Sequence, residues 1–334
     1  VRRFGSQENA PVKTNISLQD GLCLTLEAAI AEFLADCQLR QLSPTTLQWY
    51  RCALKPLARF ASTRGETEIS AVTTQTIRAF LGQKSATVQA RRLNHYRDAV
   101  DRLYQWLIEE QYARTNPAAE IKKIREGKRL MGAFNEAELE ALLGEPNTQT
   151  FLGLRDYAFM LMLLDTGIRL SEALGLRVHD IDIDGCTLKV LGKGNKERYV
   201  GFSPVLERHL RRYLVRRAVA LQGIGQIESA WVFPNQQGGQ GGAKGFQMRL
   251  KTYGDDAGVT RVRVSPHTFR HTFAVWFVRK GGSPFHLQKI LGHTSLDMSR
   301  RYCDLADTDF ISKHQELSPL ATSELGGQGR RRLR

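Results

Sequence analysis

Four of the five Ser–Pro pairs in this chain constrain its fold more than any other feature of the sequence. These four pairs begin at Ser43, Ser203, Ser265 and Ser283, and each precedes apolar residues at helical spacing. A serine side chain caps the first turn of a helix, and proline is tolerated next because its missing N–H needs no partner there. The pairs therefore predict four helix starts, distributed over both halves of the chain.

The first third of the sequence predicts helices and no strands. Apolar residues recur every three or four positions after Leu24, after Ser43, after Thr73 and over residues 86–110. Four such segments are enough to enclose a small core. We therefore expect a small all-α domain over residues 22–115.

Two segments beside this domain differ from it in composition. Residues 1–21 are polar and without periodicity, so they are predicted to form a flexible N-terminal arm. Residues 116–132 lose the apolar face and gather basic side chains. We interpret them as a basic linker, whose charge suits a path along a phosphate backbone.

The following residues, 133–307, predict a second domain that is mostly helical with a small sheet. Two short β-like runs, residues 187–191 and 198–202, flank a turn rich in Gly and Asn, which is typical of a hairpin. Residues 236–245 are glycine-rich and are interpreted as a long flexible loop. The whole chain is thus predicted to be mainly α with a small β-sheet.

The charge of the chain indicates a polyanionic partner. The 48 Lys and Arg residues outnumber the 34 Asp and Glu residues, giving a formal net charge of +14. Cations that neutralise phosphates release condensed counterions, which drives binding to nucleic acid. On the fourth predicted helix, Arg91, Arg92 and Arg97 are candidate DNA contacts, and a solvated helix face is the alternative for each of them.

Membrane and disulfide-rich proteins are disfavoured. No apolar stretch is long enough to span a bilayer, and the N-terminus lacks the apolar core of a signal peptide, so we expect a cytoplasmic protein without membrane contact. The five cysteines are scattered and form no CxxC pair, which argues against a disulfide framework and against a structural zinc site.

Five short segments of the second domain concentrate cations, imidazoles and one phenol. They are residues 166–172, 192–196, 267–271, 291–293 and 301–302. No cluster of carboxylates accompanies them, which is unusual for a hydrolase that uses a metal ion. Arginines can hold the charge that builds on phosphate oxygens, a phenol can attack phosphorus, and a lysine can protonate the leaving oxygen.

Each of these residues also has a simpler interpretation when it is taken alone. Arg169 fits a surface ion pair with Glu172, His293 fits a helix-capping histidine, and Tyr302 fits a half-buried core position. Their joint occurrence in this order favours chemistry on a phosphodiester.

In this order the segments resemble the tyrosine recombinase family, which includes phage integrases, Xer recombinases and transposon-encoded recombinases. The resemblance extends from about residue 24 to residue 307, and a tyrosine follows His293 by nine residues. The most specific segments are TGIRLSEAL at 166–174, GKGNKER at 192–198, HTFRHTFA at 267–274 and LGHTS at 291–295.

The resemblance implies six catalytic residues, namely Arg169, Lys193, His267, Arg270, His293 and Tyr302. The two arginines would clamp the scissile phosphate, and the lysine would act as general acid toward the departing 5′-hydroxyl. The first histidine would assist proton transfer from the nucleophile, and the second would hydrogen-bond the phosphate. The tyrosine would form a 3′-phosphotyrosyl bond, which conserves the energy of the broken phosphodiester, so that no metal, ATP or other cofactor would be needed.

The family's architecture is implied as well. An N-terminal SAM-like core-binding domain and a C-terminal α+β catalytic domain would enclose double-stranded DNA, and a homo-tetramer would exchange strands through a Holliday junction. Residues 308–334 would form a C-terminal helix and a basic tail that contact a neighbouring protomer. A solvated tail that binds phosphates nonspecifically is the alternative.

Several functions are compatible with this resemblance. We expect a site-specific recombinase of a mobile element, an integrase or transposase, because the added chain ends and the long loop over residues 236–245 depart from a minimal Xer enzyme. A Xer-like resolvase of chromosome dimers is the alternative within the family. A catalytically silent DNA-binding protein on the same fold and a type IB topoisomerase are alternatives of other classes.

Overall fold

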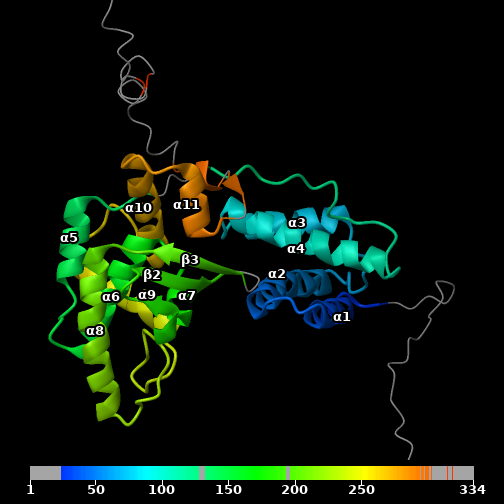
Figure 1. Ribbon diagram of the computed structural model, residues 1–334. Coiled ribbons are helices and arrows are strands. Elements are labelled where there is room, and N and C mark those ends of the chain that lie inside the picture. Colours follow the sequence, from blue (N-terminus) through cyan, green and yellow to red (C-terminus); the bar gives the residue numbers. More distant parts are fainter. Residues whose placement is uncertain are drawn as a thin grey trace, which may run out of the picture. The chain divides into compact units, whose positions relative to one another are not determined.

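The computed structural model describes residues 24–127, 132–192 and 196–293, together with residues 295, 296, 298–300, 302, 314 and 318. The chain divides into two compact units, residues 1–129 and 130–334 (Figure 1). The prediction of a mainly α fold with a small sheet is confirmed. The predicted arm over residues 1–21 and most of the predicted tail over residues 308–334 lie outside the described residues.

In its described residues the N-terminal unit contains four helices, α1 (Leu26–Leu39), α2 (Pro44–Thr63), α3 (Thr74–Ser85) and α4 (Ala90–Glu109). The side chains of Ser43 and Thr73 cap α2 and α3, each accepting a hydrogen bond from a backbone N–H three residues on. Helix α4 begins four residues later than predicted, because its N-cap Gln89 has an extended backbone.

All four helices contribute to the core of this unit. Leu54 and Leu57 of α2 and Leu103 and Leu107 of α4 are completely buried. Burial of one such side chain stabilises a fold by about 1.5–3 kcal/mol relative to leaving it exposed. The same core includes Ala118 and Ile121, so the first part of the predicted linker, residues 116–121, packs with this unit.

The C-terminal unit is built around one central helix. Helices α8 and α10 pack against α6, and α11 packs against α10 and strand β3. As far as residue 293, the described elements of this unit in chain order are α5 (Glu136–Gly144), α6 (Phe151–Thr166), α7 (Leu170–Gly175), η1 (Val178–Asp180), β1 (Ile181–Asp182), β2 (Thr187–Leu191), β3 (Glu197–Gly201), α8 (Pro204–Gly223), α9 (Ala243–Asp256), α10 (Pro266–Arg279) and α11 (Pro284–Leu291).

The sheet is antiparallel with strand order β1-β2-β3. Leu188, Val190 and Val200 point into the core, and Val190 lies opposite Arg198 in the register. The sequence predicted β2 and β3 but neither β1 nor α7, since elements of two and six residues are too short to show periodicity.

The loop before α9 is shorter than predicted. Helix α9 begins at Ala243, and Pro234 forms a β-bridge with Gln240. The side-chain oxygen of Asn235 accepts hydrogen bonds of 2.9 Å from the backbone N–H groups of Gln237 and Gly239. Residues 236–242 therefore form a loop, as predicted, but this loop is closed by hydrogen bonds and is shorter than the expected 236–245. Among the described residues, no helix has both the length and the apolar character needed to cross a membrane.

Candidate active site

The C-terminal end of α11 gathers three arginines from distant parts of the sequence. The backbone carbonyls of residues 290–292 each accept a hydrogen bond from a different guanidinium: Arg198 Nε at 2.8 Å, Arg270 Nη2 at 2.8 Å and Arg169 Nη2 at 3.2 Å. The last carbonyls of a helix have no partner within it and carry the negative end of its dipole. This helix end therefore attracts and orients three cations.

Two glycines in the left-handed conformation place the flanking residues. Gly167 ends α6 with φ 61°, and its carbonyl accepts a hydrogen bond of 2.8 Å from Arg270 Nη1. Gly292 ends α11 with φ 62°. Glycine adopts this conformation without steric cost, so the chain can reverse at each helix end. Arg169 therefore lies two residues beyond the end of α6 at Gly167, and His293 lies one residue beyond the end of α11 at Gly292.

Glu172 is a buried carboxylate that binds two of the three arginines. It accepts hydrogen bonds from Arg169 Nη1 at 2.9 Å and from both terminal nitrogens of Arg198 at 2.9 and 2.8 Å. Burial alone would raise the pKa of Glu172, but the hydrogen bonds from Arg198 and Arg169 outweigh it and hold that pKa at about 2. The ion pair between Arg169 and Glu172 that we considered is present, but it is not a surface pair, because only 3% of the Glu172 side chain is exposed.

The two predicted phosphate clamps differ in exposure. Arg270 is buried, whereas 36% of the Arg169 side chain is exposed. Burial, and then the neighbouring guanidinium of Arg169, lowers the pKa of Arg270 to about 10. Arg270 thus keeps its charge at neutral pH, and the structure brings both guanidiniums to the same helix end.

His293 is buried beside these cations. Burial, and then the charge of Arg270, lowers the pKa of His293 to about 4, so its imidazole is neutral at pH 7. Its Nδ1 lies 2.8 Å from the hydroxyl of Ser299. This partner holds the ring in one orientation, and Nε2 carries the proton where the hydroxyl donates to Nδ1. Ser299 was not predicted as a site residue, because a single serine six residues after a histidine is not a recognisable signal.

The Tyr302 ring lies between two imidazoles. Its centroid is 6.2 Å from that of His293, with the rings nearly parallel, and 5.3 Å from that of His271. Tyr302 is 8% exposed and packs in an apolar cluster with Val275 and Leu291. The structure thus brings the predicted nucleophile next to His293, and also to His271, which lies within a recognised motif but was not predicted as a site residue.

The other two predicted residues are placed differently. His267 is exposed in the first turn of α10, whereas Arg270, one turn further on, is buried. The two residues therefore lie in different environments, although they are only three positions apart on α10. Lys193 lies outside the described residues.

Comparison with known proteins identifies the family. Residues 133–309 match the family model of the phage integrase family, and residues 30–111 match that of the phage integrase N-terminal SAM-like domain. The chain belongs to the phage integrase family of tyrosine recombinases. It is 32% identical over 298 residues to tyrosine recombinase XerC of Oceanobacillus iheyensis, covering 89% of this chain and 97% of that protein. It is 31% identical over 298 residues to tyrosine recombinase XerD of Yersinia pestis, covering 87% and 97%.

Solved structures share the fold of this family member. The XerH site-specific recombinase in a post-cleavage complex with palindromic difH substrate gives a TM-score of 0.68 at 21% identity, over 86% of this chain and 83% of that chain. A lambda integrase tetramer bound to a Holliday junction gives a TM-score of 0.68 at 18% identity, over 84% of this chain and 78% of that chain.

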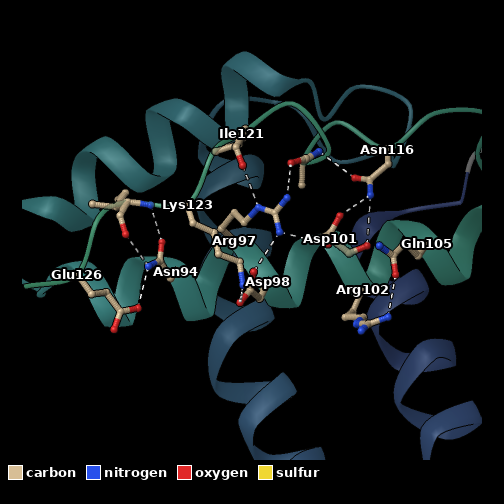
Figure 2. A network of polar contacts seen from close by, with 12 residues as sticks. Asn94, Arg97, Asp98, Asp101, Arg102, Gln105, Asn116, Ile121, Lys123 and Glu126 are labelled. Carbon is tan, nitrogen blue, oxygen red and sulfur yellow. Dashed lines mark hydrogen bonds and ion pairs between the residues drawn. The ribbon is translucent and has the colours of Figure 1, made fainter. Parts of the chain in front are cut away.

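In the SAM-like domain of this family member, Arg97 does not face outward as predicted (Figure 2). Its Nε donates to the carbonyl of Ile121 at 3.0 Å, and its Nη1 lies 3.0 Å from Asp98 and 3.3 Å from Asp101. With 15% of its side chain exposed, it is committed to contacts within the chain. These contacts hold the guanidinium within the N-terminal unit, so Arg97 does not lie on a solvated helix face. Arg91 and Arg92 are exposed.

The segment that follows this domain is held along α4 by further polar contacts (Figure 2). Asn94 accepts a hydrogen bond from the N–H of Ile124 and donates one to its carbonyl, both at 2.9 Å. Lys123 lies 2.9 Å from Asp98, and Asn116 donates to Asp101 at 2.8 Å. Residues 116–126 therefore form a strap on the N-terminal unit.

Proposed function

We propose that this protein is a site-specific DNA recombinase that cleaves and rejoins strands through a 3′-phosphotyrosine at Tyr302. The observation that carries this proposal is the convergence of Arg169, Arg270 and His293 at the end of α11, with the Tyr302 ring stacked on His293. Two guanidiniums, a neutral imidazole and a phenol are the groups that a phosphodiester exchange requires.

The first step forms one bond and breaks one. The Tyr302 oxygen attacks phosphorus, and the bond from phosphorus to the 5′-bridging oxygen breaks. A phenol has an ordinary pKa near 10, so its proton must be accepted during attack, and His267 assists that transfer. Lys193 protonates the departing 5′-oxygen. Arg169 and Arg270 hold the charge on the non-bridging oxygens, as bidentate guanidiniums do.

His293 completes the set as a hydrogen-bond donor. In this scheme the Ser299 hydroxyl donates to Nδ1, so the neutral imidazole presents its other nitrogen, as N–H, to a phosphate oxygen. A second 5′-hydroxyl then attacks the phosphotyrosine and releases Tyr302. Because the covalent bond conserves the energy of the original phosphodiester, neither ATP nor a metal ion takes part in this scheme.

We assign the parts of the chain accordingly. Residues 22–115 form the core-binding domain, residues 133–307 form the catalytic domain, and residues 308–334 contact a neighbouring protomer. Duplex DNA is the partner, and four protomers act together on a Holliday junction, as in the lambda integrase tetramer that shares this fold. The net charge of +14 supports a DNA partner.

Within this activity we favour a Xer-like recombinase. The relatives that cover 87–89% of the chain are named XerC and XerD. The compact turn before α9 also removes one of our two arguments for a mobile element. A mobile-element integrase is the second candidate, and a chromosomal rather than a transposon-borne gene neighbourhood separates the two.

Covalent trapping tests the proposal. Nicked duplexes tiled across the DNA that flanks the gene are incubated with wild type and with Tyr302→Phe in the presence of a metal chelator. We expect a complex resistant to detergent with wild type alone, on particular fragments. An equal complex with Tyr302→Phe would rule out this nucleophile. Binding without any covalent complex would favour a silent DNA-binding protein, and relaxation of supercoils without sequence preference would favour a topoisomerase.

A further inference from the structure

Arg198 on β3 is the one arginine at the end of α11 that the proposed mechanism does not use. Each nitrogen of its guanidinium is engaged: Nε donates to the carbonyl of Ile290 at 2.8 Å, and Nη1 and Nη2 donate to the two oxygens of Glu172 at 2.9 and 2.8 Å. Its side chain is 14% exposed. The guanidinium edge that would bind a phosphate bidentately is therefore already occupied by a carboxylate.

The position of Arg198 is at the base of the β2–β3 hairpin. It lies opposite Val190, next to the last paired residues of the ladder. Beyond that pair, the N–H of Gly192 donates to the carbonyl of Lys196 at 2.8 Å and closes the hairpin. The turn between these two residues carries Lys193 in the sequence.

Two glycines pack directly against this guanidinium. A Cβ added to Gly192 would lie 3.4 Å from Arg198 Nη1, and one added to Gly292 would lie 3.3 Å from its Cζ. The hairpin base and the turn that leads to His293 therefore approach Arg198 closely from two elements. The Arg198 side chain thus connects three elements. It extends from β3, binds Glu172 on α7 and donates to the carbonyl of Ile290 at the end of α11.

We infer that Arg198 is a positioning residue, which fixes the base of the hairpin carrying Lys193 against the Arg169–Arg270 pair. This inference rests on the proposed function. Arg169 has hydrogen bonds of its own to Glu172 and to Gly292, and neither of them involves Arg198. Loss of Arg198 thus impairs protonation of the leaving oxygen more than it impairs the clamp on the phosphate.

A change of leaving group separates these two effects. Nicked duplexes from the fragment that traps wild type are made with either oxygen or sulfur at the bridging 5′ position. A thiolate leaves without a proton, because a thiol has a much lower pKa than an alcohol. Correct placement of a general acid contributes about 100-fold or more to the rate on the oxygen substrate and little on the sulfur substrate.

We expect Arg198→Met and Arg198→Lys to slow cleavage of the oxygen substrate by about 100-fold and about tenfold, and to slow the sulfur substrate by about threefold or less. The lysine variant retains the charge and serves if the methionine variant fails to fold. The matched control is Lys189→Met on the same hairpin, whose side chain makes a surface ion pair with Glu197. Equal slowing on both substrates, or slowing by the control, would overturn the inference.

Hydrogen exchange on the protein without DNA gives an independent measurement. Backbone amides over residues 187–201 should exchange faster in Arg198→Lys than in wild type, and Lys189→Met should match wild type. Unchanged exchange in Arg198→Lys would show that the residue does not anchor the hairpin. If wild type formed no covalent complex with either substrate, the proposed function would fail, while the exchange result would still decide the anchoring.

Discussion

The carboxylate of Glu172 and the guanidinium of Arg198, 26 residues apart in the sequence, are joined by two parallel hydrogen bonds of 2.9 and 2.8 Å. The same carboxylate binds Arg169. A buried ion pair adds stability only when its geometry and its remaining hydrogen bonds are good, and both conditions are met here. A single acid therefore holds two arginines of the site.

This relationship predicts a specific acid sensitivity. The pKa of Glu172 is about 2 in the folded protein against 4.5 for a free carboxyl. This carboxylate contributes on the order of 3 kcal/mol to the free energy of unfolding. The contribution is fully present above pH 4.5 and is lost as the pH falls from 4.5 toward 2. Glu172→Gln should lack this component, although it is less stable at neutral pH. Urea unfolding at a series of acidic pH values measures it, and identical pH slopes in the two proteins would contradict the prediction.

Ser299 should matter to chemistry and not to DNA binding. Ser299→Ala removes the hydroxyl 2.8 Å from His293 Nδ1, so the imidazole ring is no longer held in one orientation. One hydrogen bond contributes about 0.5–1.5 kcal/mol, which corresponds to cleavage slower by about threefold to tenfold. Single-turnover cleavage of the trapped duplex measures the loss. The exposed Ser295, changed to Ala, is the control, and an equal effect there would show that His293 is not involved.

Arg97 and Arg91 should behave in opposite ways. Arg97→Gln removes a half-buried cation from Asp98, Asp101 and the carbonyl of Ile121, which should cost about 1–3 kcal/mol of unfolding free energy. Arg91→Gln on the exposed face should change stability by less than about 0.5 kcal/mol. If Arg91 contacts a phosphate, the slope of log affinity against log salt should fall by about 0.9 in that variant alone. A smaller slope in Arg97→Gln with unchanged stability would reverse this assignment.

Replacing Gly292 should strain the backbone and should also place a new side-chain atom against Arg198. Gly292→Ala places a Cβ at φ 62°, 3.3 Å from the guanidinium carbon of Arg198. Gly225→Ala has the same kind of strain at φ 70° with no atom within 4 Å of the new Cβ. Each variant should lose about 1–2 kcal/mol of stability, because an L-residue disfavours this region. Only Gly292→Ala should also slow cleavage, and equal cleavage rates in the two variants would argue against contact with Arg198.

The sequence by itself determined the local structure and the set of candidate residues. Ser43, Thr73 and Ser203 mark helix starts because a cap needs only the next three residues. The short motifs around Arg169, Arg270, His293 and Tyr302 could be recognised because each is contiguous in the chain.

Only the tertiary structure decided which groups meet. Guanidiniums from residues 169, 198 and 270 converge on the carbonyls of residues 290–292, and no local spacing encodes that contact. The same is true of the contact between Arg97 and the carbonyl of Ile121 in the strap, whereas Asp98 and Asp101, its carboxylate partners, are neighbours on α4 itself. Helix periodicity gives the direction of a side chain, whereas the partner of a buried charge depends on which distant segments the core packing brings beside it.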